Sequence, residues 1–301
     1  MAKIKKKKVA QEFTGIIGAI DYKRTGVKIF YWAMYTLCII CCLICILPPI
    51  WIMLSSFSDV KDLLAIPPSI FPKSFHPEKL IEAWNKLNFL QYYSNTFVMV
   101  IGDLLFAIFI NGLAGYVISR LKPKGGTLVL TLILWTMMMP NSLNMIPLYG
   151  TFLDFPLFHV NLTNTYWPMW LMSGANPFNI LMFKSFFDGI PSAYIEAARI
   201  DGCTNLGIFA KIILPLSKPI IMVVSIFTVT ASWDNFLWPY LILKDEGLYT
   251  VAVKIFAMKS AGFPLDLHLM ALLFAILPPL ILFVFFQKHI MTGFALGGVK
   301  G

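Results

Sequence analysis

Six long apolar stretches constrain the fold of this chain more than any other feature of the sequence. They lie near residues 29 to 54, 95 to 119, 127 to 149, 164 to 186, 218 to 242 and 266 to 286. About 20 residues of helix cross the hydrocarbon core of a bilayer, so each stretch is long enough to span it. Of the 301 residues, 58% are apolar and 13% are charged, which is far from the balance of a soluble domain. The sequence predicts an all-α, polytopic membrane protein with six transmembrane helices between residues 29 and 286.

Lysine and arginine predict the orientation of these spans. The segments on the same side as the N-terminus hold 17 of them and the opposite segments hold 7. Because positive residues collect in cytoplasmic loops, we expect a cell-membrane protein with both termini in the cytoplasm. The run AKIKKKK precedes an apolar stretch too long for a signal peptide, so the first span is expected to stay uncleaved. The cytoplasmic N-terminal segment, 1 to 28, either lies along the inner membrane surface or forms a loose tail.

A polar segment that contains a central glycine lies between the fourth and fifth apolar stretches. It reads IEAARIDGCTNLGIFAKIILP from Ile195 to Pro215. Glutamate and alanine are good helix formers, Gly202 permits a sharp turn, and Pro215 is expected to end a second helix. This segment lies within the loop 187 to 217, which the charge count places in the cytoplasm.

The order and spacing of this segment resemble the signature of the transmembrane subunits of ATP-binding-cassette importers. The resemblance implies two short helices that meet at the glycine and dock into a cleft on an ATPase subunit. The residues that match the signature, or lie within it, are Glu196, Ala197, Ala198, Asp201, Gly202, Ile212, Leu214 and Pro215.

The whole chain is similar to the smaller permease subunit of maltose-type carbohydrate importers. The similarity rests on NGLAGYVISR (111 to 120), MPNSLNMIPLY (139 to 149), the stretch from Trp233 to Pro239, and QKHIMTGFALGGVKG (287 to 301). It implies the fold of a type I importer permease, a heterodimer with a second permease, two separate ATPase subunits, and an extracytoplasmic binding protein that delivers an oligosaccharide. It also implies that the C-terminal tail, 287 to 301, reaches the ATPases through Gly297, Gly298 and Lys300, whereas the glycines alone suggest a frayed end.

Two carboxylates fall within the predicted spans. Asp103 lies in the second span and Asp234 in the fifth, and each should face protein or water, because a charge at mid-bilayer costs about 2.5–3.5 kcal/mol on insertion scales. Trp233, Asp234 and Asn235 combine an aromatic face with hydrogen-bonding groups, as a sugar ring requires, and suggest a place on the substrate pathway. Alternatively, Asp234 bonds a neighbouring helix and the aromatics form an interfacial belt. In the related family the fifth span usually reads Trp-Asn at this point.

Two external segments complete the chain. Residues 55 to 94 are rich in proline and then predict a short helix from Glu78 to Lys86, so an ordered external cap is expected. The loop from Lys244 to Leu265 carries Ser260 and Gly262. The resemblance implies that this loop enters the opened binding protein, and Gly262 would allow a thin turn there. A passive connector is the alternative.

The sequence suggests no enzyme, cofactor or metal site. No Gly-x-x-x-x-Gly-Lys-Ser/Thr loop is present to hold ATP phosphates, and the four histidines are scattered. Cys38, Cys41, Cys42 and Cys45 share a helix face but climb about 10 Å, too far for one zinc ion. The net charge of +9 follows the membrane orientation, so no nucleic acid partner is expected. An importer for a peptide, polyamine or phosphate ester is the alternative function, while a secondary transporter would need inverted repeats that are not visible.

Overall fold

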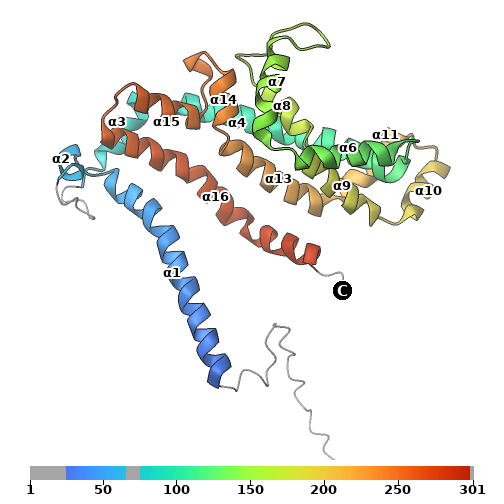
Figure 1. Ribbon diagram of the computed structural model, residues 1–301, viewed down its shortest axis with the longest axis horizontal. Coiled ribbons are helices and arrows are strands. Elements are labelled where there is room, and N and C mark those ends of the chain that lie inside the picture. Colours follow the sequence, from blue (N-terminus) through green and yellow to red (C-terminus); the bar gives the residue numbers. More distant parts are fainter. Residues whose placement is uncertain (1–24, 66–74, 299–301) are drawn as a thin grey trace, which may run out of the picture.

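The computed structural model of the chain describes residues 25–65 and 75–298. Within these ranges the chain is helical, apart from loops and one isolated bridge between Phe155 and Val160. The all-α class expected from the sequence is therefore confirmed. Figure 1 shows an elongated body from which one long helix, α1, extends.

Three predicted spans are single helical runs. The first is α1 (Thr25–Ser55), and the second runs from Phe89 to Leu121 through α4 (Phe89–Phe106), η2 (Ala107–Asn111), α5 (Gly112–Tyr116) and η3 (Val117–Leu121). The sixth is α16 (Leu265–Gly298), of which Leu265–Phe285 has the length and hydropathy of a span. Each of these runs is long and apolar enough to cross a membrane.

The other three predicted spans are broken, which the apolar pattern did not show. α6 (Gly126–Met138) and α7 (Asn141–Leu153) meet at an angle of 112° beside Pro140, and α8 (Trp167–Gly174) is separated from α9 (Pro177–Asp188). α13 (Lys218–Trp233) is followed, after a break, by α14 (Leu237–Ile242). A proline lacks the N–H that a continuous helix needs, so Pro140 and Pro177 favour ends at these places. By length and composition the described helices give three unbroken spans, or five if two bent pairs, α6 with α7 and Asn205–Leu216 with α13, each count as one span.

The segment between the fourth and fifth spans forms short helices. α10 (Ser192–Ile200) is followed by a turn and by the run of α11 (Asn205–Ile208), η4 (Phe209–Ile213) and α12 (Leu214–Leu216). This run meets α13 at 81° beside Ser217. The second helix therefore ends at Leu216 and not at Pro215, because a proline in the first turn of α12 needs no backbone donor.

The predicted external cap is partly described. It contains α2 (Val60–Leu63) and α3 (Glu78–Lys86). The bounds expected for the short helix from Glu78 to Lys86 are therefore confirmed. The loop from Lys244 to Leu265, in which a thin turn is expected at Gly262, is largely folded before that turn. It contains η5 (Glu246–Leu248) and α15 (Val251–Ser260), and α15 buries several side chains against α4 and α16.

Two buried clusters hold the ends of the body together. One packs α9, the α10–α12 segment and α13 around Phe183, Phe187 and Ile213, and the other packs α3, α4, α15 and α16 around Phe89, Met258 and Met270. At Gly115 a Cβ atom would lie 2.8 Å from the Cβ of Phe183, so only glycine permits the close approach of α5 and α9. These contacts fix the helix breaks between the two clusters.

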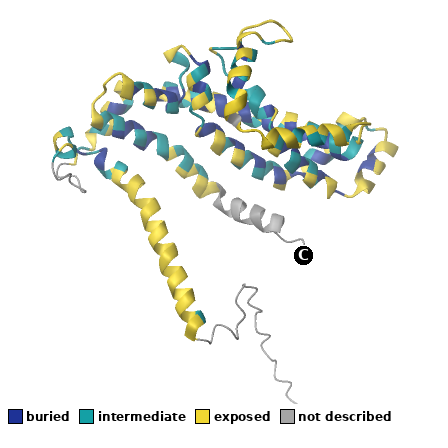
Figure 2. Cartoon of the chain, in the orientation of Figure 1, coloured by how far each residue is buried: buried dark blue, intermediate teal, exposed yellow. Residues whose placement is uncertain are grey.

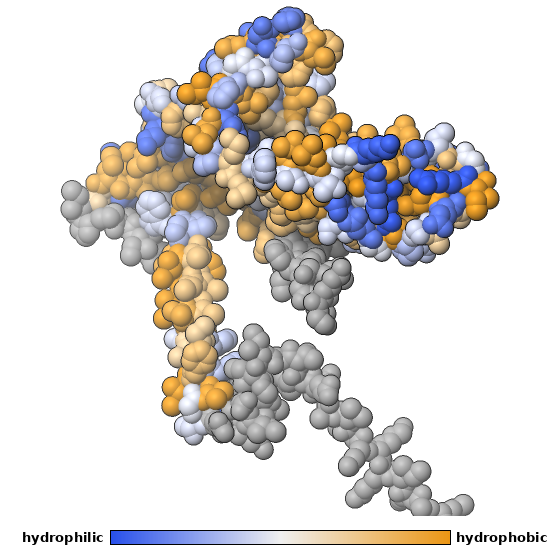
Figure 3. All heavy atoms as spheres, turned by 45° about the vertical axis from the view of Figure 1, so that its right-hand side comes forward, coloured by the Kyte–Doolittle hydropathy of each residue, from blue (hydrophilic) through white to orange (hydrophobic). Residues whose placement is uncertain are grey.

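By contrast, α1 contacts α16 but is exposed along most of its length. Its most apolar window has no buried residue, and Ser55 at its end is the one residue of the helix that is buried. Figure 2 shows the exposed surface along its length, and Figure 3 shows that this surface is largely hydrophobic. In water such a surface would be unfavourable, so α1 is suited to lipid or to another apolar helix.

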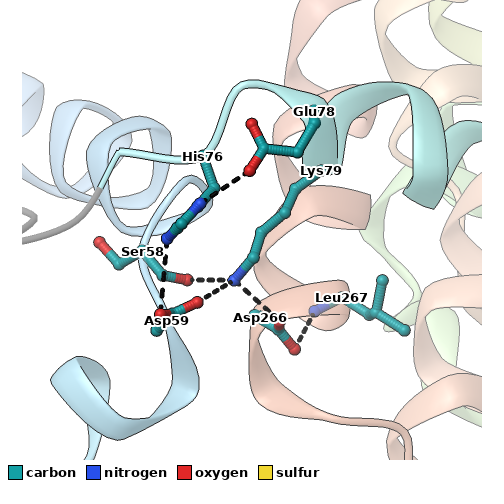
Figure 4. Close-up of polar contacts among 7 residues, drawn as sticks. All are labelled: Ser58, Asp59, His76, Glu78, Lys79, Asp266 and Leu267. Carbon is teal, nitrogen blue, oxygen red and sulfur yellow. Dashed lines mark hydrogen bonds and ion pairs between the residues drawn. The ribbon is translucent and has the colours of Figure 1, made fainter.

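Polar contacts join the end of α1 to α3 and α16 (Figure 4). The ammonium group of Lys79 donates to the carbonyl of Ser58 at 2.8 Å, to Asp59 Oδ1 at 3.0 Å and to Asp266 Oδ2 at 3.2 Å. His76 contacts Glu78 Oε1 at 2.7 Å and Asp59 Oδ2 at 3.5 Å. We refer to Ser58, Asp59, His76, Glu78, Lys79 and Asp266 as the external clasp, a name that follows the orientation expected from the charge distribution.

Candidate functional site

The helix breaks surround a large cavity. It has a volume of about 890 Å³ and lies among α4, α7, α8, α9, α13 and α14. Its polar lining consists of Asp103, Asn144, Thr151, Ser173, Asn176, Asn179, Thr228, Ser232 and Asn235. Its aromatic lining consists of Phe152, Phe155, Phe178, Phe227 and Trp238. Non-helical backbone within a membrane is tolerated where it lines a cavity or is buried in protein, and these breaks meet that condition.

Asn111 stabilises the break between α8 and α9. Its side chain donates to the carbonyl of Ser173 at 2.9 Å and accepts from the backbone N–H of Asn176 at 3.1 Å. Asn176 in turn accepts from the N–H of Asn179 at 3.2 Å and caps the start of α9. The polar groups that the break releases are thereby satisfied, and two asparagines are held in the cavity wall.

Asp103 lies at the inner wall of this cavity and is only 4% exposed. Its Oδ2 accepts a hydrogen bond from the hydroxyl of Ser232, and its backbone carbonyl accepts one from Ser173 Oγ at 3.0 Å. Its Oδ1 is buried without a hydrogen-bond partner. The hydroxyl of Thr228, which also lines the cavity, is likewise buried and unpaired. Buried polar atoms without partners are rare, so both oxygens retain unused hydrogen-bonding capacity just behind the cavity surface.

The three residues expected on the substrate pathway line two different cavities. Asn235 lines the large cavity. Trp233 and Asp234 line a separate cavity of about 590 Å³ beside α16, where Trp233 is buried and Asp234 is exposed. The indole N–H of Trp233 donates to the carbonyl of Ala275 at 3.3 Å. Asp103, which the sequence marks only as an ionisable residue in a span, is therefore the carboxylate of the larger cavity.

The α10–α12 segment forms a second candidate site. Gly202 has a φ of +77°, and its surroundings are empty, so the turn requires glycine for its backbone and not for space. The N–H of Cys203 bonds the carbonyl of Ala198 at 2.9 Å across this turn, and Thr204 caps α11. The turn joins two short helices, as the sequence predicts.

The signature residues of this segment divide into a packed set and an exposed set. Ala198, Ile212 and Leu214 pack into the cluster around Phe183 and Ile213. Glu196, Ala197, Asp201, Gly202 and Pro215 are exposed. Apolar side chains at the same tip are also exposed: Tyr194 by 53%, Ile200 by 87% and Leu206 by 65%. Figure 3 shows hydrophilic residues mixed with hydrophobic ones at this end of the body. The mixture is typical of a surface that binds another protein.

The second span is fastened to this segment by hydrogen bonds. The guanidinium of Arg120 donates to the carbonyls of Phe187 and Ile190, just before α10 begins. Ser119 Oγ donates to Asp188 Oδ1 at 2.6 Å, and Lys184 pairs with Asp188 Oδ2 at 2.6 Å. We refer to Ser119, Arg120, Lys184 and Asp188 as the joint.

The remaining predicted site residues lie at the ends of the sixth span. Ser260 ends α15, and Gly262, with a φ of +71°, lies in the exposed turn before α16. Gly297 and Gly298 are the last residues of α16, and Lys300 lies outside the described residues. Among the described residues no group of three histidine, cysteine or acidic side chains is arranged to hold a metal ion.

A polytopic helical subunit with a polar cavity between broken spans and an exposed helical segment at one end is a transporter component. Residues 104–294 match the family described as binding-protein-dependent transport system inner membrane component, and the chain belongs to this family. The family is one of transport proteins and not of catalysts.

Named relatives support this assignment. The chain is 31% identical to the polygalacturonan/rhamnogalacturonan transport system permease protein YtcP of Bacillus subtilis, over 91% of this chain and 99% of that protein. It is also 31% identical to the arabinooligosaccharides transport system permease protein AraQ of Bacillus subtilis, over 71% of this chain and 74% of that protein. A chain of a bacterial ABC transporter involved in the import of the acidic polysaccharide alginate has the same fold, with a TM-score of 0.73, 21% identity, and coverage of 88% of this chain and 98% of that chain.

Proposed function

We propose that the chain is one permease subunit of an ATP-binding-cassette importer that carries a carbohydrate, in particular an oligosaccharide, across the cell membrane. The observation that carries this proposal is the cavity around Asp103, which joins hydroxyl, amide and carboxyl groups to aromatic rings. Sugars present hydroxyls for hydrogen bonding and apolar ring faces for stacking, and binding sites of this size combine both kinds of group. The names of the relatives AraQ and YtcP favour carbohydrate over a peptide, polyamine or phosphate ester.

The proposed transporter needs further subunits. A second permease would complete the pathway as a heterodimer, an extracytoplasmic binding protein would deliver the solute, and two ATPase subunits would supply the energy. We assign the exposed face of α10 and α11, with Glu196, Ala197 and Asp201, to contact with an ATPase. The end of α16, with Gly297, Gly298 and the following Lys300, is proposed as a second contact with the ATPases. The turn at Ser260 and Gly262 is proposed to meet the binding protein.

The arrangement of the ends supports the orientation expected from charge. The joint brings the end of the second span, with Arg120, Lys122 and Lys124, to the same end of the body as α10. The external clasp joins the residues that follow α1 to α3 and to the start of α16, at a different place from α10. Both termini are therefore proposed to be cytoplasmic, with lipid bilayer around the apolar surface of α1.

Transport by the assembled complex tests this function. The two permeases and the ATPase are purified together, placed in proteoliposomes with ATP inside, and supplied with the binding protein loaded with arabino-, galacto- or malto-oligosaccharides. Uptake of at least one of these sugars that depends on ATP and on the binding protein is expected. Stimulation of ATP hydrolysis by a peptide, polyamine or phosphate ester and by none of the sugars would contradict the carbohydrate function.

A further inference from the structure

The lining of the large cavity is unusual in its charge. Asp103 is an acidic residue, and among the described residues of the lining none is lysine, arginine or histidine. The other polar groups are neutral amides and hydroxyls. The lining therefore offers hydrogen bonds in both directions but no positive partner for an anion.

Two oxygen atoms beside the cavity have no hydrogen-bond partner within the described part of the chain. Asp103 Oδ1 accepts hydrogen bonds, and the hydroxyl of Thr228 can donate or accept. Both residues are more than nine-tenths buried and line the same cavity. Each oxygen has almost no accessible surface, so a solute would reach it only after a small side-chain movement, and a sugar hydroxyl, which both donates and accepts, would then pair with either oxygen.

A carboxylate or sulfonate on the solute would find no positively charged partner in this lining. It would lose its hydration beside the carboxyl group of Asp103 without a cation to compensate it, and burying an unpaired charge is strongly unfavourable. Like charges a few ångströms apart near a protein surface repel by more than the energy of a tenfold change in affinity.

From the proposed function and this charge pattern, we infer that the cavity around Asp103 selects neutral glycosides and rejects sugars that carry a carboxylate or sulfonate. The inference distinguishes among the carbohydrates named for relatives of this chain, since these include the acidic polymer polygalacturonan for YtcP and neutral arabinooligosaccharides for AraQ. Asp103 thus acts as a specificity-determining residue of this subunit.

A pair of matched trisaccharides tests the inference at the permease itself. The nucleotide-free complex in lipid nanodiscs, without its binding protein, is mixed with α-1,4-galactotriose or α-1,4-trigalacturonate. The two probes differ at C6, which bears a hydroxymethyl group in one and a carboxylate in the other. Contact is measured by saturation-transfer NMR over a concentration series, and we expect trigalacturonate to bind at least about tenfold more weakly than galactotriose.

Two variants make the test specific to the cavity. Asp103→Asn removes the acidic group and should narrow the difference between the probes. Asn144→Lys adds a cation at an exposed position of the lining and should strengthen trigalacturonate binding, whereas Asn144→Gln serves as the neutral control. If Asp103→Asn fails to assemble, the comparison of the two Asn144 variants decides the question.

The outcomes separate this inference from the proposed function. Binding of trigalacturonate to the unmodified complex that equals or exceeds that of galactotriose would overturn the charge selection while leaving carbohydrate transport intact. Absence of contact by both probes, together with no stimulation of ATP hydrolysis by any sugar-loaded binding protein, would reject the carbohydrate function and this inference with it.

Discussion

At the scale of single residues, Gly202 offers the sharpest test of the α10–α11 turn. Its φ of +77° lies in the left-handed region, where an L-residue is strained by about 1–2 kcal/mol, most severely when β-branched. Because no atom surrounds the position within 4 Å, a side chain there meets no steric obstacle. Gly202→Val should therefore shift α10 relative to α11 and reduce the ATP hydrolysis stimulated by the loaded binding protein.

Gly202→Asn provides the matched control, since asparagine tolerates left-handed angles and adds a larger side chain. It should retain most of the stimulated ATPase. Both complexes are compared at equal assembly, measured by size-exclusion chromatography. Full stimulation of the valine complex would show that the turn does not transmit motion.

The two carboxylates within the spans show how far the sequence could predict the site. The sequence pattern singled out Asp103 and Asp234 equally as residues that should face protein or water, because each is an ionisable residue in an apolar stretch. Which one reaches the large cavity depends on the break after Trp233, which leaves Asp234 exposed beside α16 and Asn235 on the cavity. Helix rotation and breaks are set by tertiary packing, so the local pattern could not separate the two residues.

Because Asp234 and Asn235 line different cavities, substitutions at these two neighbouring residues should have different effects on transport. Asp234→Asn should keep sugar uptake within about twofold, as for substitutions at exposed positions away from a site. Asn235→Ala removes an amide from the cavity wall and should lower uptake further. Uptake is measured at subsaturating sugar and matched expression. A greater loss for Asp234→Asn than for Asn235→Ala would place the pathway at the smaller cavity instead.

At the scale of helices, the joint links the second span to the segment that we assign to the ATPase. Arg120 holds two carbonyls at the end of α9, and hydrogen bonds to charged groups contribute about 1.5–3 kcal/mol. Arg120→Met should leave these carbonyls unpaired and loosen α10. We expect faster hydrogen exchange over residues 191 to 204 and weaker stimulation of ATP hydrolysis by the loaded binding protein.

Arg120→Lys is the conservative variant, because lysine can bond one carbonyl but lacks the planar fork of arginine. An intermediate effect on both readouts is expected. Lys124→Met, in the same loop, removes an exposed positive charge and should change neither. Increased exchange in the Arg120→Met complex with unchanged stimulation would limit the joint to a structural role.

The sequence predicted helix bounds and turns correctly where residues close together in the chain determine them. The external helix from Glu78 to Lys86 and the turn at Gly202 were predicted, since proline, helix formers and glycine act over a few residues. The breaks near Asn176 and Phe236 were not predicted. Asn176-Pro177 is a local signal for the first of these breaks, but the flanking residues are apolar enough for one continuous span, and the break is also stabilised by Asn111, which is distant in sequence.

At the scale of the whole molecule, α1 stands apart from the body and is attached at its Ser55 end (Figure 1). The external clasp lies at this attachment and joins the residues after α1 to α3 and α16 (Figure 4). It therefore fixes the direction in which α1 leaves the body. A helix with so little contact in its own chain depends on this attachment to meet lipid or the second permease in a defined position.

The clasp predicts a characteristic dependence of stability on pH. The hydrogen bond from Lys79 lowers the pKa of Asp59 below its usual value. Burial opposes the charge on Lys79, but its bonds to Asp59 and Asp266 outweigh this effect and raise the pKa of Lys79. The stabilisation from Asp59 is present above its unfolded pKa of about 4 and is lost as pH falls through the lower folded pKa. That from Lys79 is present below about 10.4 and is lost as pH rises through its higher folded pKa.

Lys79→Met should therefore lower the thermal stability of the complex by a nearly constant amount between about pH 5 and pH 9, and the difference from the unmodified complex should shrink below about pH 4. Because the paired groups are partly exposed to solvent, the loss is expected to be small. Scanning fluorimetry across this range measures it, with Lys61→Met, an exposed lysine of α2, as the control. Because His76 also contacts Asp59, the series is repeated with His76→Gln in both backgrounds. Equal thermal stability of the Lys79→Met and unmodified complexes throughout about pH 5 to 9 would show that the pairs formed by Lys79 do not stabilise the clasp.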